Sequence, residues 1–292
     1  MSAQPTASAA IAIIDSALRR ERLHGGMISV TWRLHLPDGS SAVLKQGRDV
    51  PSDLYAVEAA GLNALRVPGA PVVPEVLGHG RDWLLLEDLG DQGQWEDLPR
   101  PANDPWWDGF GRAMAHLHGC TYNRCGWWHD TYWGTMRMDN RWNADGAAFY
   151  AEQRFRWFLR RSDICRLVPG HRRRQVDILA ARLASIVPPQ PACLNHGDLW
   201  AGNRACTRDG RPAMIDPFVH AGWASCDLHN CVQYGGFPER FFDAYRESRW
   251  LPSDWRDHVQ PFFVLHHLGL IDQGFGDRET WDEFVRILDR FT

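Results

Sequence analysis

One change of pattern constrains the fold of this chain more than any other feature. Up to residue 87 the sequence consists mainly of short extended segments, and beyond it the apolar spacing is mainly helical. Residues 28–36 alternate apolar and polar side chains, a Pro-Asp-Gly-Ser turn follows, and residues 41–46 resume the extended pattern, which is typical of a β-hairpin. Residues 75–78 and 83–87 form a second extended pair. We therefore expect a small antiparallel sheet followed by a larger helical part.

Glycine and proline accumulate after residue 89, and this loop-rich stretch indicates a boundary between two domains, residues 1–89 and 90–292. The fold class we predict is α+β. The first domain should carry helices over residues 9–22 and 51–65. The second should carry a single extended interruption, residues 192–215, and six helices, over residues 106–118, 147–161, 175–186, 238–249, 253–270 and 279–291.

The composition of the chain excludes several classes of function. Apolar residues make up 44% and charged residues 23%, an ordinary globular composition. The 32 basic and 36 acidic residues leave a formal charge of −4, so we expect no nucleic-acid partner. The apolar runs fall short of the roughly 20 residues that span a bilayer, and the N-terminus lacks the layout of a secretion signal. We expect no membrane partner and a cytoplasmic location, and the sequence is silent on the oligomeric state.

The extended interruption contains the residues that can perform chemistry. It carries the run His-Gly-Asp-Leu-Trp-Ala-Gly-Asn over residues 196–203, followed by an Asp209-Gly210 turn signal. If these two residues form a two-residue turn, Asn203 faces Asp216, with Cα atoms about 4.5 Å apart. An amide oxygen and a carboxylate are hard oxygen ligands that suit Mg²⁺, whose other ligands are water and phosphate oxygens. We therefore predict that Asn203 and Asp216 hold a metal ion.

Asp198 lies five residues before Asn203. Its carboxylate could accept the proton of a hydroxyl group that attacks a phosphate. The alternative is a loop aspartate that caps neighbouring N–H groups, which is the commoner role of an isolated Asp beside Gly. The coincidence of Asp198, Asn203, a hairpin turn and Asp216 at these spacings favours the catalytic role.

Lys45 indicates a second part of the same site. In the first predicted hairpin it lies opposite Trp32, within an apolar stripe. A buried ammonium without a partner costs several kcal/mol, so we expect Glu58, in the following helix, to pair with it. Phosphate oxygens could share the charge. The alternative is an exposed strand lysine, which is common at the edge of a sheet.

These residues and their order resemble the protein-kinase-like phosphotransferases. The resemblance is closest to the fructosamine kinase (ketosamine kinase) family, and it covers nearly the whole chain. It rests on the 196–203 run, an Ile-Asp-Pro that contains Asp216, and four further segments: Gly25-Gly26 with the following strand, E-A-x-G-L at residues 58–62, V-P-E-V-L-G at residues 73–78, and G-G-F-P-E-R-F-F-D-A-Y at residues 235–245.

The resemblance implies a two-lobe, protein-kinase-like fold with ATP and Mg²⁺ between the lobes. Gly25 and Gly26 would then contact the phosphates, although the loop is short and has no G-x-G-x-x-G pattern. The carbonyl group of Glu87 and the N–H of Leu89 would meet adenine, and Trp200 would shape the sugar pocket. The implied reaction transfers the γ-phosphate to a sugar hydroxyl of a small-molecule or protein-linked ketosamine.

One departure from the family pattern leaves more than one class of phosphate acceptor compatible with the sequence. Members of the family tend to carry an Arg-Glu pair before an Ala-Asp-Leu segment, and this chain reads Ala-Ser-Cys-Asp-Leu at residues 224–228. We expect Asp227 to accept hydrogen bonds from loop N–H groups, and His196 to orient the catalytic loop. The alternatives are an aminoglycoside- or aminoalcohol-type phosphotransferase of the same fold, or a catalytically silent nucleotide-binding protein.

Overall fold

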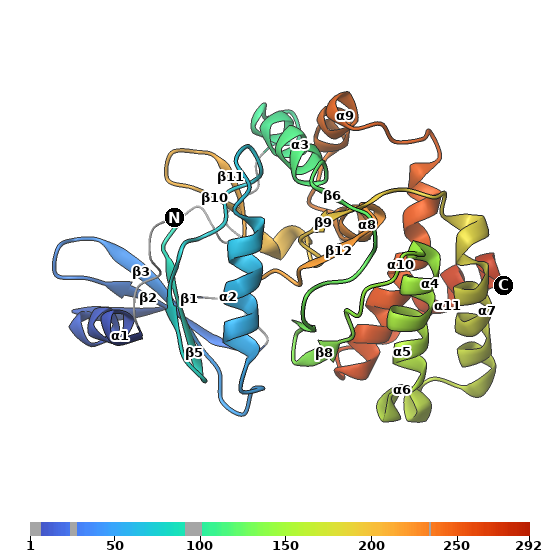
Figure 1. The fold of residues 1–292 in the computed structure, drawn as a ribbon, viewed down its shortest axis with the longest axis horizontal. Coiled ribbons are helices and arrows are strands. Elements are labelled where there is room, and N and C mark those ends of the chain that lie inside the picture. The colour runs from blue at the N-terminus through green and yellow to red at the C-terminus, as the bar shows by residue number, and fades with distance from the viewer. Residues whose placement is uncertain (1–6, 24–27, 91–100, 234) are drawn as a thin grey trace.

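The computed structural model describes residues 7–23, 28–90, 101–233 and 235–292. A five-stranded antiparallel sheet lies at one end of the molecule (Figure 1). Helix α1 (Ala7–Ser16) contacts one face of this sheet and helix α2 (Leu54–Leu65) the other. The strands, in spatial order, are β1 (Arg19–Leu23), β2 (Val30–His35), β3 (Ser41–Gln46), β5 (Trp83–Glu87) and β4 (Val76–His79).

Alternation along strand β3 assigns its side chains to the two faces of the sheet. Ala42 and Leu44 join the small apolar cluster beneath α1. Val43 and Lys45 point to the opposite face, toward α2, where they neighbour the buried leucines of β5. Successive side chains of a strand point to opposite faces of the sheet. Because Ala42 and Leu44 are buried against α1, Lys45 lies on the face that α2 covers.

The helix predicted over residues 9–22 is correct only in its first part. Helix α1 ends at Ser16, and the following residues form β1, which pairs along its whole length with β2. The pattern of apolar residues did not reveal this strand, because it lies at the edge of the sheet and has no fully buried side chain. Its backbone hydrogen bonds to β2 determine its conformation.

The register predicted for the first hairpin is wrong by one residue. Leu36 N–H donates to the Ser40 carbonyl group (2.9 Å), so the loop has three residues and Gly39 adopts a left-handed conformation (φ 83°). This is the loop in which a type I turn is followed by a left-handed residue. Lys45 consequently faces Thr31, and not Trp32.

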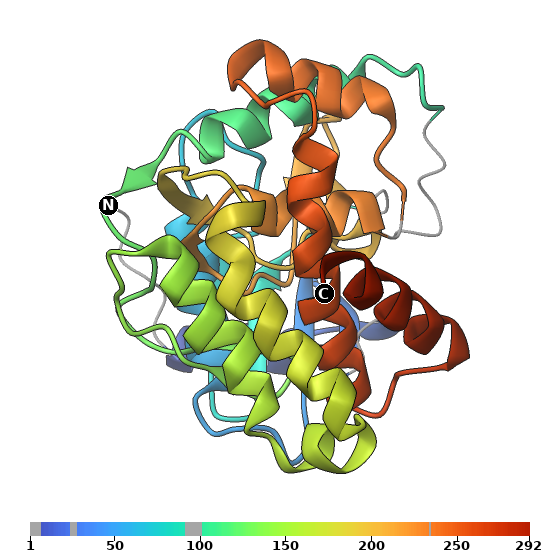
Figure 2. The ribbon, with the colours of Figure 1, turned by 90° about the vertical axis from the view of Figure 1, so that its right-hand side faces the viewer.

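The helical part follows the predicted segments with several additions (Figure 1). The expected helix over residues 147–161 is divided by a π-helical turn at Ala151–Phe155. Two helices, α6 and α8, were not predicted. In Figure 2 the green helices α4 to α6 lie beside the yellow helix α7, with the red helices α10 and α11 next to them. The helices are α3 (Trp106–Leu117), α4 (Gly146–Tyr150), α5 (Arg156–Leu159), α6 (Ser162–Leu167), α7 (Gly170–Ile186), α8 (Ser225–Gln233), α9 (Glu239–Ser248), α10 (Trp255–Asp272) and α11 (Arg278–Phe291).

Short strands form three further sheets, so the prediction of a single extended interruption is wrong. Each of these strands has only two to four residues, which is too short for a pattern of alternation to be visible in the sequence. They are β6 (Thr121–Tyr122), β9 (Ala192–Asn195) and β12 (His220–Gly222) in one sheet, the β7 (Thr131–Trp133) and β8 (Met136–Met138) hairpin, and the β10 (Arg204–Cys206) and β11 (Pro212–Met214) hairpin.

The α+β architecture is therefore confirmed, whereas the domain boundary between residues 89 and 90 stays a prediction. No helix within the described ranges is long and apolar enough to cross a membrane.

We expect the protein to lose stability in mild acid because histidines are buried in neutral form. Burial lowers the pKa of His220 to about 3 and that of His229 to about 4. In the unfolded chain both take up a proton as the pH falls below about 6.5, which lowers the free energy of unfolding by up to about 1.4 kcal/mol per pH unit for each residue. Their stabilising contribution should be complete above about pH 7 and lost progressively between about pH 6.5 and 4. Melting temperatures that stay equal at pH 7.5 and pH 5 would contradict this expectation.

Candidate active site

A cavity of about 650 Å³ lies between α2 and the segments that surround the 196–203 run. It is lined by six residues that the sequence predicted for the site: Lys45, Glu58, Asp198, Trp200, Asn203 and Asp216. The structure therefore brings together residues from strand β3, helix α2 and both ends of the β10–β11 hairpin. Such a meeting of one cation, one amide and three carboxylates is suited to binding phosphate and a divalent ion.

The Lys45 ammonium is the electrostatic centre of the cavity. Its Nζ atom lies 2.6 Å from Oε1 of Glu58 and 2.9 Å from Oδ1 of Asp216. Burial by itself disfavours the charged amine, but the two carboxylates outweigh burial and raise the pKa of Lys45 above its ordinary value. Lys45 is therefore a cation at any physiological pH, and it connects the sheet, α2 and the segment after β11.

Asp227 holds the start of the 196–203 run in place. Its two carboxylate oxygens accept hydrogen bonds from the backbone N–H groups of His196 (2.7 Å) and Gly197 (2.6 Å), and Nε2 of His118 lies 3.1 Å away. Burial opposes ionisation, but these donors keep the pKa of Asp227 below its usual value. Gly197 has a φ of 87°, and a Cβ atom there would lie 2.0 Å from the Phe218 carbonyl oxygen. The expectation that Asp227 is a structural acceptor is confirmed.

His196 is fixed by contacts on both of its ring nitrogens. Nε2 lies 2.8 Å from the Ile215 carbonyl oxygen, and Nδ1 accepts a hydrogen bond from the Asp198 backbone N–H (3.3 Å). Burial lowers the pKa of His196, so the ring is neutral. This geometry agrees with the predicted role of His196 in orienting the loop.

The Asp198 carboxylate lies next to Asn203. Nδ2 of Asn203 donates to the Asp198 carbonyl oxygen (2.7 Å) and to its carboxylate Oδ2 (3.0 Å). Burial raises the pKa of Asp198 to about 7, and the negative charge of Asp216 adds to the increase, while hydrogen bonds from Asn203 and from the Trp133 side chain oppose it. A carboxyl group that titrates near neutral pH is suited to accepting a proton from an alcohol.

The register predicted for the β10–β11 hairpin is also wrong by one residue. Its loop has three residues, with Gly210 in the left-handed conformation (φ 85°), so Asn203 bonds to Ile215 and not to Asp216. Asp216 follows with a φ of 56°, an uncommon value for a residue with a side chain. This turn of the backbone keeps Asp216 beside Asn203, whose Nδ2 atom lies 3.5 Å from the Asp216 carbonyl oxygen. Asn203 and Asp216 therefore lie close together, as predicted, although they are not paired across the hairpin.

The donor set of Asn203 and Asp216 fits a Mg²⁺ ion that is shared with a substrate. Asn203 uses its amide nitrogen to contact Asp198, and Asp216 offers Oδ1 to Lys45. An amide oxygen and a second carboxylate oxygen then supply two hard ligands, and Mg²⁺ commonly takes the remainder from water and phosphate. Across the described ranges, no group of three or more His, Cys, Asp or Glu side chains is arranged to hold a metal by itself.

The described lining of this cavity does not account for the other predicted site residues. Gly25 and Gly26 lie outside the described residues. Glu87 and Leu89 are absent from the described lining, and the Leu89 side chain packs against Ala205 of β10. Their assignments to phosphate and adenine stay predictions, as does the assignment of Trp200 to the sugar.

The cavity also contains residues that the sequence analysis missed. Tyr132 and Trp133 of strand β7 line it, as do His266 and Gln273 at α10. His266 is buried in α10, and its ring lies 5.1 Å from that of Trp133. No spacing relative to the 196–203 run could have revealed these residues, because they reach the cavity only through the packing of β7 and α10.

Backbone and side-chain contacts attach the β10–β11 hairpin to the sheet part of the molecule. Val72 donates to the Pro212 carbonyl oxygen (2.9 Å) and accepts from the Met214 N–H (2.8 Å). At the tip of the hairpin, Arg208 lies 2.9 Å from Ser41 Oγ and 3.5 Å from the buried carboxylate of Asp88. The hairpin that places Asn203 and Asp216 is thus fixed to both parts of the molecule.

Comparison with known proteins agrees with this geometry. A fructosamine kinase family model matches residues 6–289. A probable ketoamine kinase of Thermus thermophilus is 31% identical over 262 residues, which cover 87% of this chain and 88% of that protein. The probable ketoamine kinase YniA of Escherichia coli is 30% identical over 254 residues, which cover 85% and 84%.

Solved structures extend the similarity to the fold. A crystal structure described as that of a "putative fructosamine-3-kinase" from Thermobifida fusca has a TM-score of 0.84 and 26% identity, and the match covers 98% of this chain and 99% of that one. The aminoglycoside phosphotransferase APH(4)-Ia has a TM-score of 0.61 at 14% identity, with coverage of 98% and 97%, and it shares the fold alone. The predicted protein-kinase-like fold and phosphotransferase class are confirmed. The chain belongs to the fructosamine kinase family.

Proposed function

We propose that this protein transfers the γ-phosphate of ATP to a sugar hydroxyl of a ketosamine, either a small molecule or a protein-linked group. The observation that carries the proposal is the position of Lys45, which contacts Glu58 and Asp216 within the cavity that also holds Asp198 and Asn203. Family membership and the similarity to probable ketoamine kinases support the acceptor class.

Asp198 is the proposed base. Its carboxylate accepts the proton of the attacking hydroxyl group, and its pKa of about 7 leaves a substantial fraction ionised at neutral pH. Asn203 holds Asp198 by two hydrogen bonds, so the orientation of the carboxylate is set before the substrate binds. Catalysis of this kind depends mainly on positioning and on neutralising charge.

Lys45 is the proposed ligand of the nontransferred phosphates. Glu58 keeps the ammonium in position, and the phosphate oxygens share its charge with Asp216. Asn203 and Asp216 are the proposed ligands of Mg²⁺, which neutralises the charge that develops on the phosphate oxygens. We further propose that Gly25 and Gly26 contact the phosphates and that Glu87 and Leu89 contact adenine.

The charge of the cavity favours a ketosamine over an aminoglycoside. Its described lining contains three carboxylates, and Lys45, which contacts two of them, Glu58 and Asp216, offsets one of the three negative charges. The proposed Mg²⁺ at Asn203 and Asp216 would offset the other two. An aminoglycoside carries several ammonium groups, and no carboxylate charge of the described lining is then left to balance them. Trp200 and Trp133 supply flat apolar surfaces suited to a sugar ring with a single amine substituent.

A panel of acceptors tests the proposed reaction. The protein is incubated with Mg²⁺, labelled ATP and, separately, fructosamine compounds, ribulosamine compounds, aminoglycosides and aminoalcohols, and the phosphorylated acceptor is measured. We expect transfer to a ketosamine and little or none to the other acceptors. Transfer to aminoglycosides alone would establish the alternative kinase. ATP binding without transfer to any acceptor would indicate a catalytically silent protein.

We expect Asp198→Asn to lower kcat by about 10²- to 10⁴-fold, because the amide cannot accept the hydroxyl proton. Nucleotide affinity should stay within about twofold of the original, since Lys45 and Asp216 are unchanged. Steady-state kinetics with the ketosamine acceptor give kcat, and a direct binding measurement gives the nucleotide affinity. Asp163→Asn, which changes an exposed carboxylate that pairs with Arg166, is the control. An unchanged kcat would remove Asp198 from the proposed role.

Lys45→Met should lower kcat/KM for ATP by about 10²- to 10³-fold, because a preorganised donor to the phosphates is lost. The change also leaves Glu58 and Asp216 without their shared cation, which should reduce thermal stability. Steady-state kinetics with varied ATP and a melting curve measure both effects. A variant that uses ATP at full rate would contradict the assignment of Lys45 to the phosphates.

A further inference from the structure

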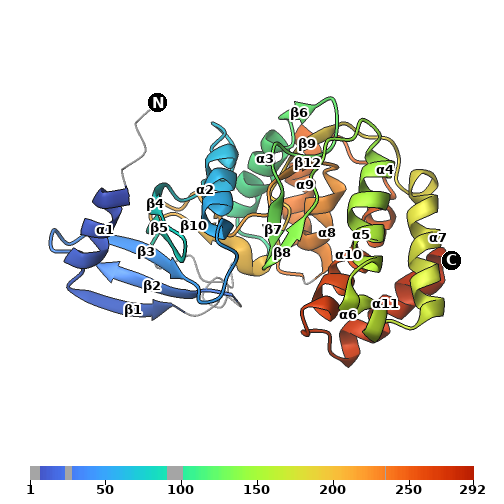
Figure 3. The ribbon, with the colours of Figure 1, turned by 60° about the horizontal axis from the view of Figure 1, so that its bottom comes forward.

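The β7–β8 hairpin connects the helical part of the molecule with helix α2. Figure 3 shows it between α2 and α10. Its two strands are joined by a short turn in which Gly134 has a φ of 63°. Tyr132, Trp133 and Gly134 line the cavity, so the hairpin forms one wall of the candidate active site. No motif of the sequence analysis assigned a role to this segment.

Asp53 makes an unusual contact with the hairpin. It occupies the N-cap position of α2, where an aspartate side chain commonly accepts a hydrogen bond from the first turn of its own helix. The Asp53 side chain makes no such capping bond. Instead, its Oδ1 accepts from the Tyr132 hydroxyl group (2.7 Å) and its Oδ2 lies 3.2 Å from Nη1 of Arg137. Both carboxylate oxygens of Asp53 thus contact residues about 80 positions away in the chain and none in the first turn of α2.

The two contacts to Asp53 differ in strength. The Arg137 and Asp53 side chains are 55% and 43% exposed, and an ion pair in that environment contributes little. The Tyr132 hydroxyl bond is short, partly buried and directed at a charged acceptor, which makes it the stronger of the two. Tyr132 is therefore the residue through which the hairpin holds the first turn of α2.

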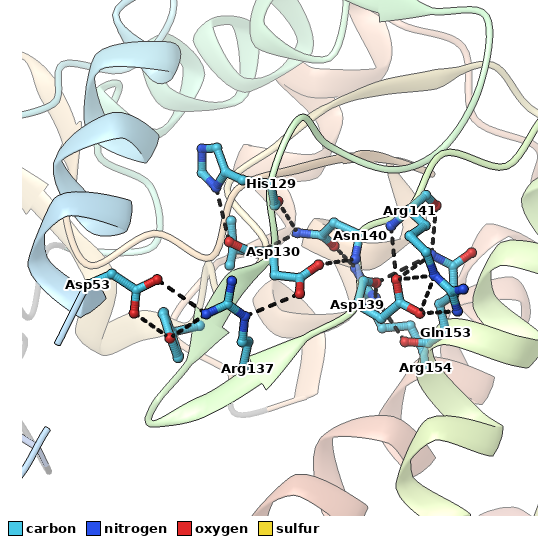
Figure 4. A network of polar contacts seen from close by, with 11 residues as sticks. Asp53, His129, Asp130, Arg137, Asp139, Asn140, Arg141, Gln153 and Arg154 are labelled. Carbon is cyan, nitrogen blue, oxygen red and sulfur yellow. Dashed lines mark hydrogen bonds and ion pairs between the residues drawn. The ribbon is translucent and has the colours of Figure 1, made fainter. Parts of the chain in front are cut away.

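The base of the hairpin is anchored in a polar network whose inner members, Asn140 and Arg154, are buried (Figure 4). Asp130 binds Arg137 through Oδ2 (3.2 Å) and accepts a hydrogen bond from the Asn140 backbone N–H (3.1 Å). The Asn140 side chain accepts from Nη2 of Arg154 (2.7 Å), which lies in the π-helical turn. The buried Arg154 guanidinium lies 5.4 Å from the centre of the Phe218 ring, close to the Asp216 segment. The hairpin is thus a firm support for α2.

Helix α2 transmits this support to the phosphate-binding lysine. Glu58 lies five residues after Asp53, about one and a half helical turns along α2, and it contacts Lys45 at 2.6 Å. Tyr55, between them, bonds to Ser29 of the sheet part at 2.7 Å. A shift or fraying of the first turn of α2 would consequently change the position of Glu58 relative to Lys45.

We propose that Tyr132 is a positioning residue for nucleotide binding, because its bond to Asp53 fixes α2 and, through Glu58, the Lys45 ammonium. The inference rests on the proposed function for the role of Lys45 toward phosphate. The contact between the hairpin and α2 does not depend on that role and can be tested without a substrate.

The first experiment measures amide hydrogen exchange in the protein without ligand. Tyr132→Phe keeps the aromatic ring and removes only the hydroxyl group, so we expect faster exchange in peptides that cover residues 51–65, with no change in those of α7 and α11. Asp53→Ala, which removes the acceptor oxygens, should have a similar effect. Asp177→Asn, which alters a carboxylate paired with Arg156 in the helical part, is the matched control and should leave exchange over residues 51–65 unchanged. Unchanged exchange over residues 51–65 in Tyr132→Phe would overturn the inference, whatever the protein's activity.

The second experiment measures the affinity for a nonhydrolysable ATP analogue with Mg²⁺ by calorimetry, in the absence of acceptor. Tyr132→Phe and Asp53→Ala should each weaken binding by about three- to tenfold, and the double variant should be no weaker than the weaker single variant, because the same hydrogen bond is lost in all three. Arg137→Gln should change affinity by less than about twofold. Additive losses, or unchanged affinity in Tyr132→Phe, would contradict the proposed positioning. If the unaltered protein binds the analogue but phosphorylates no acceptor, the proposed function fails while this result stands.

Discussion

The contact of one buried ammonium with two carboxylates is the interaction on which the rest of the structure depends. Lys45 comes from the sheet, Glu58 from α2 and Asp216 from the segment after β11. A buried charge without compensation is costly, so these three segments are held to a common point. The cavity lies at that point, and the residues that can bind phosphate and accept a proton are arranged around it.

Two further connections lie between the sheet part and the helical part. The β10–β11 hairpin joins Val72 by backbone hydrogen bonds and reaches Asp88 through Arg208. The β7–β8 hairpin reaches α2 through Tyr132 and Asp53. Together with Lys45 they limit how far the two parts can move relative to each other. Phosphoryl transfer depends on the accurate placement of reacting groups, so such restraint suits the proposed chemistry.

Local patterns in the sequence predicted most of the elements, and the errors have identifiable physical causes. Local periodicity predicts a helix up to residue 22 and does not reveal strand β1, because the pairing of β1 with β2 lies outside any local pattern. An Asp-Gly pair favours a two-residue loop, whereas each of these two hairpin loops has three residues with a left-handed glycine, Gly39 or Gly210. Each error displaced the register by one residue. The predicted contact between Asn203 and Asp216 persists because Asp216 itself adopts a left-handed backbone.

The sequence by itself determined which charged and amide side chains meet at the cavity, because burying Lys45 demanded a counter-ion and the spacing of Asp198, Asn203 and Asp216 confined them to one short hairpin region. Only the tertiary structure decided the walls of the cavity and the support of α2. Tyr132 and Asp53 are 79 residues apart, and no local pattern encodes a contact over that distance. The contact between Tyr132 and Asp53 forms only when the β7–β8 hairpin and α2 pack side by side.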